Sequence, residues 1–144
     1  MVHTGEKVFR FATAPPPEGQ FWILFQTTGW NEEYLLSRNE LMKAVSQSWY
    51  CVCAYDQDAL VGFGRIVSDG ILHAMIYDLI VLPSYQKCGI GSRILDMLVR
   101  KCRDTGIRDI QLFCAQGKQR FYEKRGFVSR PDNAPGMDYR PGGV

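Results

Sequence analysis

The sequence lacks a long hydrophobic run. No stretch of about 18 consecutive apolar residues occurs in the 144-residue chain, so we expect no membrane-spanning helix. Residues 1–7 contain no apolar segment typical of a secretory signal, so we expect no such signal. The net charge of +2 is too small to indicate a nucleic-acid partner. We therefore expect neither nucleic acid nor a membrane among the partners.

Metal-ligating patterns are also missing. The chain has two histidines, and its five cysteines form no C-x-x-C pair, so we expect no zinc site and no other bound metal. The odd number of cysteines also argues against a complete set of disulfides. Cys51-Val52-Cys53 alternates as a strand does. We expect buried, reduced thiols and a location in the cytoplasm.

The length and the hydrophobic patterning predict a single α/β domain over residues 1–144, with flexible ends at 1–7 and 140–144. A helix is expected to begin with Asn31 as its N-cap and to continue through Val45. The clearest helix runs from Ile90 to Thr105 and ends before Gly106. Further helices are predicted at 20–28 and 119–124, and strands at 8–12, 49–55, 60–67, 73–82, 110–114 and 127–128. This order indicates a mixed sheet.

The most informative segment is a glycine loop between a strand and a helix. An apolar strand ends at Pro83, and a short loop segment that carries Gly89 and Gly91 leads into the long helix. Glycines allow backbone N–H groups to approach an anion closely, and the positive end of the helix dipole favours negative charge there. The third glycine of a dinucleotide fingerprint is missing, because position 94 is Ile94. A Walker loop is absent too, and a purely structural turn remains an alternative.

Two motifs resemble those of one family. Gln86-Lys87-Cys88-Gly89-Ile90-Gly91 is similar to the Q/R-x-x-G-x-G/A pyrophosphate loop of the GNAT superfamily of acetyl-CoA-dependent N-acetyltransferases. Phe121-Tyr122-Glu123-Lys124-Arg125-Gly126-Phe127 resembles that family's F-Y-x-K-x-G-F segment. The order of the elements agrees from Val8 to Tyr139. The resemblance, closest to the small-amine type, implies a mixed central sheet of about six to seven strands, splayed at strands 4 and 5 and flanked by about four helices.

The resemblance also implies a site for acetyl-CoA as the co-substrate. The pyrophosphate is expected on the backbone amides of 87–92, with Gln86 bracing the loop or the phosphate. Pantetheine is expected along the backbone of the fourth strand. The implied cofactor-binding residues are Leu79, Ile80, Val81, Gln86, Lys87, Cys88, Gly89, Ile90, Gly91 and Ser92. The chain departs from a common family pattern after the fifth strand, where Cys114-Ala115-Gln116-Gly117 replaces a segment containing asparagine.

Acetyl transfer to an amine requires two proton movements. A primary alkylamine has a pKa of about 10.4 and is almost entirely protonated at pH 7, and the departing thiolate needs a proton. By resemblance, Tyr122 is the general acid and Asp78, on the fourth strand, is the general base. Pairing of Asp78 with an arginine such as Arg65 is an equal alternative. His73 is a second candidate base, although it is expected near the start of the strand.

The acceptor is expected near the aromatic residues of the N-terminal third. Trp22, Phe25, Trp30 and Tyr34 could hold an ammonium group or an aryl ring, and ordinary packing of a helix on the sheet is the alternative. The resulting hypothesis is an N-acetyltransferase acting on a small primary amine. A protein or peptide N-acetyltransferase and a non-catalytic acyl-CoA-binding module are the alternatives. The resemblance is also compatible with a homodimer.

Overall fold

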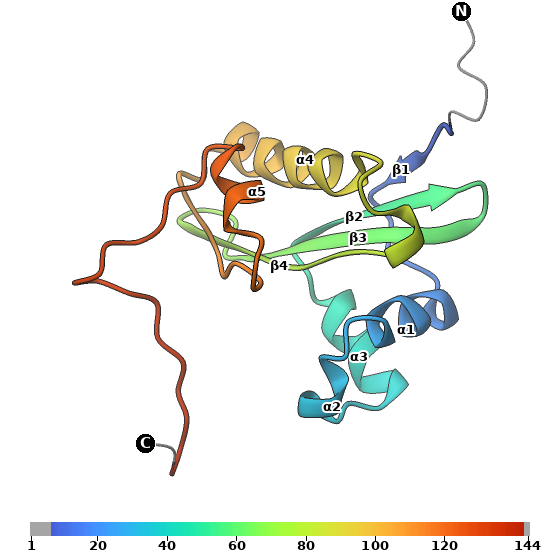
Figure 1. The fold of residues 1–144 in the computed structure, drawn as a ribbon, viewed down its shortest axis with the longest axis horizontal. Coiled ribbons are helices and arrows are strands. Elements are labelled where there is room, and N and C mark those ends of the chain that lie inside the picture. The colour runs from blue at the N-terminus through green and yellow to red at the C-terminus, as the bar shows by residue number, and fades with distance from the viewer. Residues whose placement is uncertain (1–6, 143–144) are drawn as a thin grey trace, which may run out of the picture. The chain divides into compact units, whose positions relative to one another are not determined.

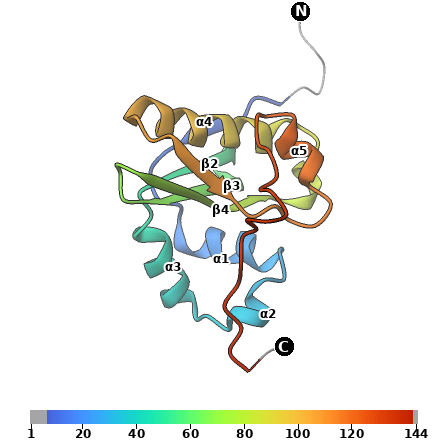
Figure 2. The same cartoon turned by 90° about the vertical axis from the view of Figure 1, so that its left-hand side faces the viewer.

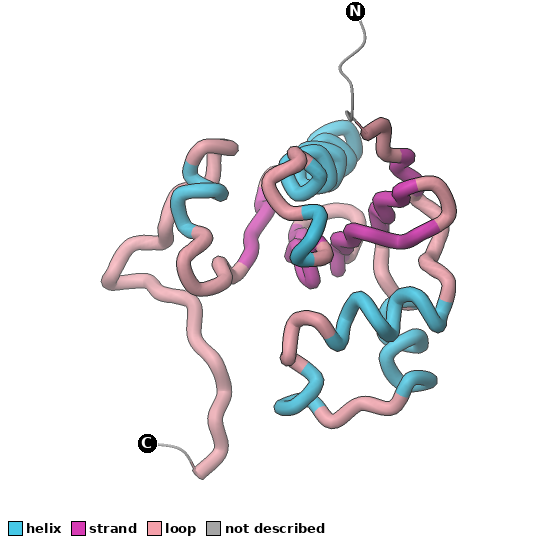
Figure 3. Tube along the Cα trace, turned by 45° about the vertical axis from the view of Figure 1, so that its right-hand side comes forward, coloured by secondary structure: helices cyan, strands magenta, loops and turns pink. Residues whose placement is uncertain are grey.

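The computed structural model describes residues 7–142, which form two compact units divided between Leu112 and Phe113. The first unit contains the β-sheet and four of the α-helices, whereas the second contains α5 (Gln119–Glu123) and is otherwise mostly loop (Figure 3). No helix in the described part of the chain is long and apolar enough to cross a membrane.

The first unit is built on a mixed five-stranded sheet with the order β1-β2-β3-β4-β5 (Figure 1). Neighbouring strands pair antiparallel from β1 to β4, and β5 pairs parallel with β4. The strands are β1 (Arg10–Ala12), β2 (Tyr50–Asp56), β3 (Ala59–Ser68), β4 (His73–Val81) and β5 (Asp109–Leu112). The α/β class and the mixed sheet are confirmed.

The predicted strand count is wrong. The structure has five strands over residues 7–142 rather than six or seven, and the expected strand at 127–128 does not form. Pro131 and Pro135 follow closely, and proline supplies no N–H group to a β-ladder. The described helices also exceed the expected four, because there are five α-helices and the 3-10 helix η1 (Pro83–Tyr85).

Helices cover both faces of the sheet. Helix α4 (Ile90–Thr105) packs across β2, β3 and β4 on one face, and α1 (Glu18–Gln26) and α3 (Arg38–Ser46) lie on the other face (Figures 1 and 2). The bounds of α4 agree with the prediction, and Gly106 caps its C-terminus in the left-handed conformation. This arrangement places the N-terminus of α4 just after the end of β4.

The helix predicted to run from Asn31 to Val45 is two helices. Helix α2 (Asn31–Tyr34) ends at Leu35, whose φ of 57° is left-handed. Ser37 then starts α3 with a capping box, in which its side chain accepts from the Glu40 N–H and the Glu40 carboxylate accepts from the Ser37 N–H. Asn31 is therefore not an N-cap; its side chain instead bridges the backbone N–H and C=O of Leu36.

The thiols only partly follow the prediction. Cys51, Cys53 and Cys102 are buried, whereas Cys88 and Cys114 are exposed, and all five are free. Cys88 lies in the glycine loop before α4, where the backbone is at the surface. The expectation of buried thiols is therefore wrong for the cysteines that lie outside strands and long helices.

Two glycines of β3 allow α4 to pack closely on the sheet. A Cβ at Gly62 would lie 2.9 Å from Ile90 Cγ2, and one at Gly64 would lie 2.8 Å from Ile94 Cγ2 and 3.0 Å from Leu98 Cδ1. These apolar side chains of α4 are fully buried. The helix therefore fits against the sheet because β3 carries no side chains at these two positions.

We predict that Gly64→Ala lowers the free energy of unfolding by about 1–3 kcal/mol. The added methyl group meets Ile94 Cγ2, and a β-branched side chain has few other rotamers to adopt inside a helix. Urea denaturation measures the effect.

Gly19→Ala is the matched control, because Gly19 lies in α1 and nothing lies within 4 Å of its added Cβ. This change should stabilise the protein by up to about 1 kcal/mol. Equal effects of the two substitutions would contradict the close packing of α4 on β3.

Candidate functional site

The glycine loop leaves the N-terminus of α4 available to an anion. Lys87 (φ 65°) and Gly89 (φ 83°) adopt left-handed conformations, and residues 86–89 are exposed. Gly89 is the N-cap of the 16-residue helix, and no side chain caps it. The first backbone N–H groups of a helix have no partner within it, and the helix dipole adds positive potential there. The geometry therefore suits a phosphate group.

Gln86 braces this loop, as the sequence suggested. Its side-chain Nε2 donates to the backbone carbonyl of Val81 over 3.2 Å, which ties the loop to the end of β4. The Val81 carbonyl is thus engaged inside the protein, at a residue of the strand whose backbone was expected to hold pantetheine.

A second contact also holds the loop, and no sequence pattern indicated it. The Tyr85 hydroxyl donates to Asp56 Oδ2 over 2.6 Å, and Lys7 Nζ lies 3.0 Å from the same oxygen. The hydrogen bond from Tyr85, followed by that from Lys7, lowers the pKa of the Asp56 carboxyl. Asp56 ends β2 and Tyr85 ends η1, so the contact fixes the residue that immediately precedes Gln86.

The end of β4 extends beyond its parallel partner. The ladder between β4 and β5 ends at the pair Ile76 and Leu112, so residues 77–81 of β4 have no partner in β5. The Leu82 N–H donates to the Val61 carbonyl on β3 over 2.9 Å. Because backbone groups alternate along a strand, those of Val81 point away from β3. Ile80 and Ile90 are 4% and 1% exposed, so both residues offer almost no surface to a ligand.

Asp78 lies in a β-bulge and is paired with Arg65. The pairing of β3 with β4 passes from Phe63–Ile80 to Arg65–Tyr77, so Gly64 faces both Asp78 and Leu79. Asp78 has a φ of 56°, and Arg65 Nε donates to its Oδ2 over 2.7 Å. The alternative considered for Asp78, a pair with Arg65, is therefore formed. The carboxylate lies on the face of the sheet opposite α4, because Arg65 has the same orientation as Phe63, whose ring packs on α1.

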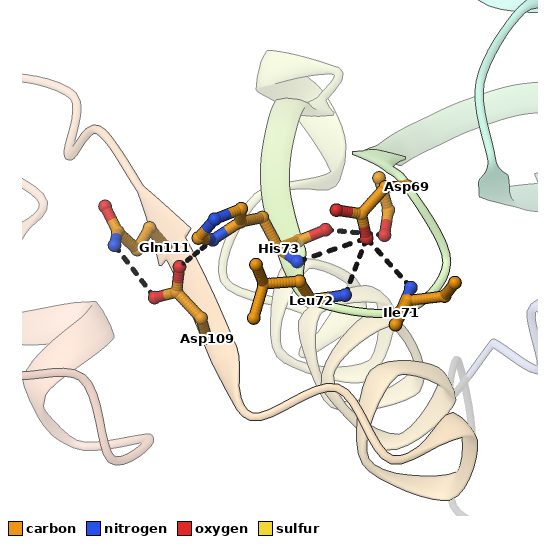
Figure 4. Close-up of polar contacts among 7 residues, drawn as sticks. Asp69, Ile71, Leu72, His73, Asp109 and Gln111 are labelled. Carbon is orange, nitrogen blue, oxygen red and sulfur yellow. Dashed lines mark hydrogen bonds and ion pairs between the residues drawn. The ribbon is translucent and has the colours of Figure 1, made fainter.

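His73 belongs to a different cluster at the far end of β4 (Figure 4). Its side chain is 64% exposed, and Nδ1 contacts Asp109 Oδ2 across the first pair of the β4–β5 ladder. Asp69 Oδ1 accepts the backbone N–H groups of Ile71, Leu72 and His73. Five residues of extended strand, or about 16 Å, separate His73 from Asp78. His73 therefore lies in a cluster that joins the ends of β4 and β5, away from Asp78 in the bulge.

In the second unit, Tyr122 is held by the end of α5. The N–H of Phe127 donates to the Tyr122 carbonyl and that of Gly126 to the Glu123 carbonyl, the hydrogen bonds of a Schellman motif. Gly126 has the required left-handed φ of 92°, and the Phe127 ring packs edge-on against Tyr122 at 5.9 Å. Burial, with the nearby Cys114 thiol, raises the pKa of the Tyr122 phenol. The motif's glycine and final phenylalanine thus fix the backbone and ring of Tyr122.

The four aromatic residues proposed for the acceptor differ in exposure. Phe25 is 3% exposed and belongs to the core, and Trp22 is partly buried and packs against that core. Trp30 and Tyr34, at 36% and 60%, are the two with substantial exposed surface. Trp30 packs edge-on against Phe25 with 5.9 Å between the ring centroids.

These features agree with the comparisons with known proteins. The model of the acetyltransferase (GNAT) family matches residues 17–127, which include the glycine loop, the bulge and the Phe121–Phe127 segment. The chain belongs to the GNAT family. Its fold is also similar to that of a GNAT-family acetyltransferase from Streptococcus pneumoniae, with a TM-score of 0.79, 28% identity, and coverage of 94% of this chain and all (100%) of that one.

Curated GNAT relatives match a shorter stretch. The chain is 39% identical over 77 residues to GCN5-related N-acetyltransferase 1, chloroplastic, from Arabidopsis thaliana, which covers 54% of this chain and 39% of that protein. It is 37% identical over 82 residues to the uncharacterized N-acetyltransferase ycf52 of Pyropia yezoensis, covering 57% of this chain and 47% of the relative. The chain thus spans less than half the length of these two relatives.

The loop geometry predicts that Gly89→Ala weakens coenzyme A binding. Alanine in a left-handed conformation costs about 1–2 kcal/mol, so the loop should relax away from the geometry that directs its amides toward an anion. Isothermal titration calorimetry with coenzyme A measures the loss, which we expect to be at least tenfold in Kd.

Gly106→Ala provides the control, because Gly106 (φ 93°) caps the other end of α4 and its added Cβ also meets nothing within 4 Å. The Gly106→Ala variant should lose about as much stability as Gly89→Ala and should keep the wild-type Kd for coenzyme A. Equal losses of affinity in both variants would contradict a site at the N-terminus of α4.

Proposed function

We propose that the chain transfers the acetyl group of acetyl-CoA to a primary amine of a small molecule. The observation that carries the proposal is the uncapped N-terminus of α4, bordered by left-handed Lys87 and Gly89, directly after a strand whose end has no β5 partner. Membership of the GNAT family supports the same activity.

The residues present fit acetyl-CoA. The amides of residues 87–92 would hold the pyrophosphate, and Lys87 would add positive charge beside it. Leu79 and Val81 would hold pantetheine through the backbone of β4, with the Val81 N–H as the contributing group because Gln86 engages the carbonyl. When bound, acetyl-CoA supplies an acetyl group activated as a thioester.

Two side chains of the chain would then move protons. The amine nitrogen forms a bond with the thioester carbonyl carbon, and the carbon–sulfur bond breaks. Asp78 would accept a proton from the amine through water, and Tyr122 would donate its phenolic proton to the departing sulfur. A phenol with a raised pKa stays protonated at neutral pH, which suits this role.

Asp78 and Tyr122 belong to different compact units. The family match covers residues of both units, because it runs from residue 17 to residue 127. Location in the cytoplasm and pairing into a homodimer stay predictions.

A protein amine is the second candidate acceptor. The chain is 34% identical over 86 residues to a protein named histone acetyltransferase TAP1 in Glycine max, covering 60% of this chain and 37% of that one. A panel of arylalkylamines, polyamines and lysine-containing or N-terminal peptides, with free thiol measured after each incubation, separates the two acceptors. Binding of acetyl-CoA without turnover on any amine would instead indicate a non-catalytic binding module.

We predict that Tyr122→Phe lowers kcat by about 10²–10⁴-fold, because it removes only the donated proton. The ring contacts with Phe121 and Phe127 remain, so stability and the Kd for acetyl-CoA should change little. Steady-state kinetics with the best amine of the panel measures the effect. Tyr139→Phe is the control, since Tyr139 is 89% exposed. Unchanged kcat of the Tyr122→Phe variant would show that Tyr122 is not the general acid.

The pH dependence of kcat is a further prediction. Burial disfavours the phenolate of Tyr122, so the phenol keeps its proton to a pH above the ordinary tyrosine value of about 10. The descending limb of kcat at saturating substrates should therefore lie above pH 10. Measurement between pH 6 and 11 tests this, and a descending limb below pH 9 would exclude Tyr122 as the group responsible.

A further inference from the structure

The bulge at Asp78 is held by one cation. Arg65 Nε donates to Asp78 Oδ2 over 2.7 Å, and the side chains of the two residues are only 17% and 20% exposed. No described residue donates to the other oxygen, Oδ1. The carboxylate is thus fixed through one oxygen and keeps the second available.

Arg65 is itself fixed by the end of α3. Its Nη1 donates to Ser48 Oγ over 3.2 Å and to the Ala44 carbonyl over 3.4 Å. Ala44 lies in the last turn of α3, where the carbonyls carry partial negative charge that favours a guanidinium. Three elements therefore meet at one side chain: β3 through Arg65, the bulge of β4, and α3.

The charge of this pair matters for amine chemistry. A carboxylate on its own stabilises the ammonium form of an amine, which has no lone pair to react. The Arg65 guanidinium on Oδ2 offsets this stabilisation of the ammonium form. Oδ1 can still accept a proton through water. The planar Arg65 group also holds the carboxylate in one orientation, which a flexible lysine would do less well.

We propose that Arg65 is a positioning residue for acetyl transfer, which acts by orienting Asp78 and by balancing its charge. The inference rests on the proposed function, in which Asp78 accepts the proton of the amine. Arg65 acts through Asp78 and contacts neither substrate. Ser48 has a smaller part, because it restricts rotation of the guanidinium.

The test compares Arg65→Gln, Arg65→Lys, Asp78→Asn and the double variant Arg65→Gln/Asp78→Asn. Arg65→Gln should lower kcat by about tenfold to a hundredfold, with an amine KM that is unchanged or lower. Arg65→Lys should recover part of the loss. The double variant should be no slower than Asp78→Asn alone, because residues that act through one another are not additive.

Binding and stability measurements separate this role from simple unfolding. Every variant should keep the wild-type Kd for acetyl-CoA, because the residues proposed to bind it lie in the loop before α4 and not in the Arg65–Asp78 pair. Arg100→Gln, an exposed arginine of α4, is the matched control and should keep full activity. If Arg65→Gln does not fold, Ser48→Ala replaces it and should lower kcat severalfold while leaving the Arg65–Asp78 pair intact.

The outcomes distinguish this inference from the proposed function. A wild-type protein that acetylates no amine contradicts the proposed function itself. An active wild type with a folded Arg65→Gln variant of normal kcat overturns the positioning role. Additive losses in the double variant overturn it as well, because they show that Arg65 does not act through Asp78.

Discussion

The close packing of α4 on β3 is the constraint on which the site depends. Gly62 and Gly64 have no side chains, so Ile90, Ile94 and Leu98 lie directly on the sheet. Ile90 is both the first residue of α4 and the first buried residue after the glycine loop. Its contact with Gly62 therefore fixes the N-terminus of the helix against the sheet beside the end of β4, and it positions the amides of the loop.

The other features of the site act on β4 and on the loop that follows it. The bulge places two residues of β4 opposite Gly64, and Arg65 holds Asp78 on the face away from α4. The loop is braced by the hydrogen bond from Gln86 to Val81 at the end of β4 and by the hydrogen bond from Tyr85 to Asp56 at the end of β2. The glycine loop and the Asp78 carboxylate are thus held separately, the loop by Gln86 and Tyr85 and the carboxylate by Arg65.

Local signals in the sequence predicted local structure well. Helix α4 begins and ends where its periodic apolar residues and flanking glycines indicated. The β2–β3 hairpin and the glycine loop were also identified, because turn residues mark them. The break between α2 and α3 was missed, although Ser37 and Glu40 have the spacing of a capping box. The apolar stripe continued across the break and concealed it.

Contacts between distant residues could not be predicted in this way. Tyr85 and Asp56 are 29 positions apart, and their hydrogen bond depends on the placement of η1 beside the end of β2. The Arg65–Asp78 pair was one of two readings of Asp78, and the register of β3 with β4 decides that it forms. The extra strand was predicted wrongly, because the proline-rich segment after Phe127 makes no ladder in the described residues.

The most direct test of the account is a nuclear magnetic resonance titration of the uniformly ¹⁵N-labelled protein with acetyl-CoA. We expect the backbone amides of residues 87–92 to show the largest shifts, with Val81 following, because these groups lie at the N-terminus of α4 and the unpaired end of β4. Saturation by acetyl-CoA that leaves those amides unchanged and shifts residues elsewhere would contradict the central claim.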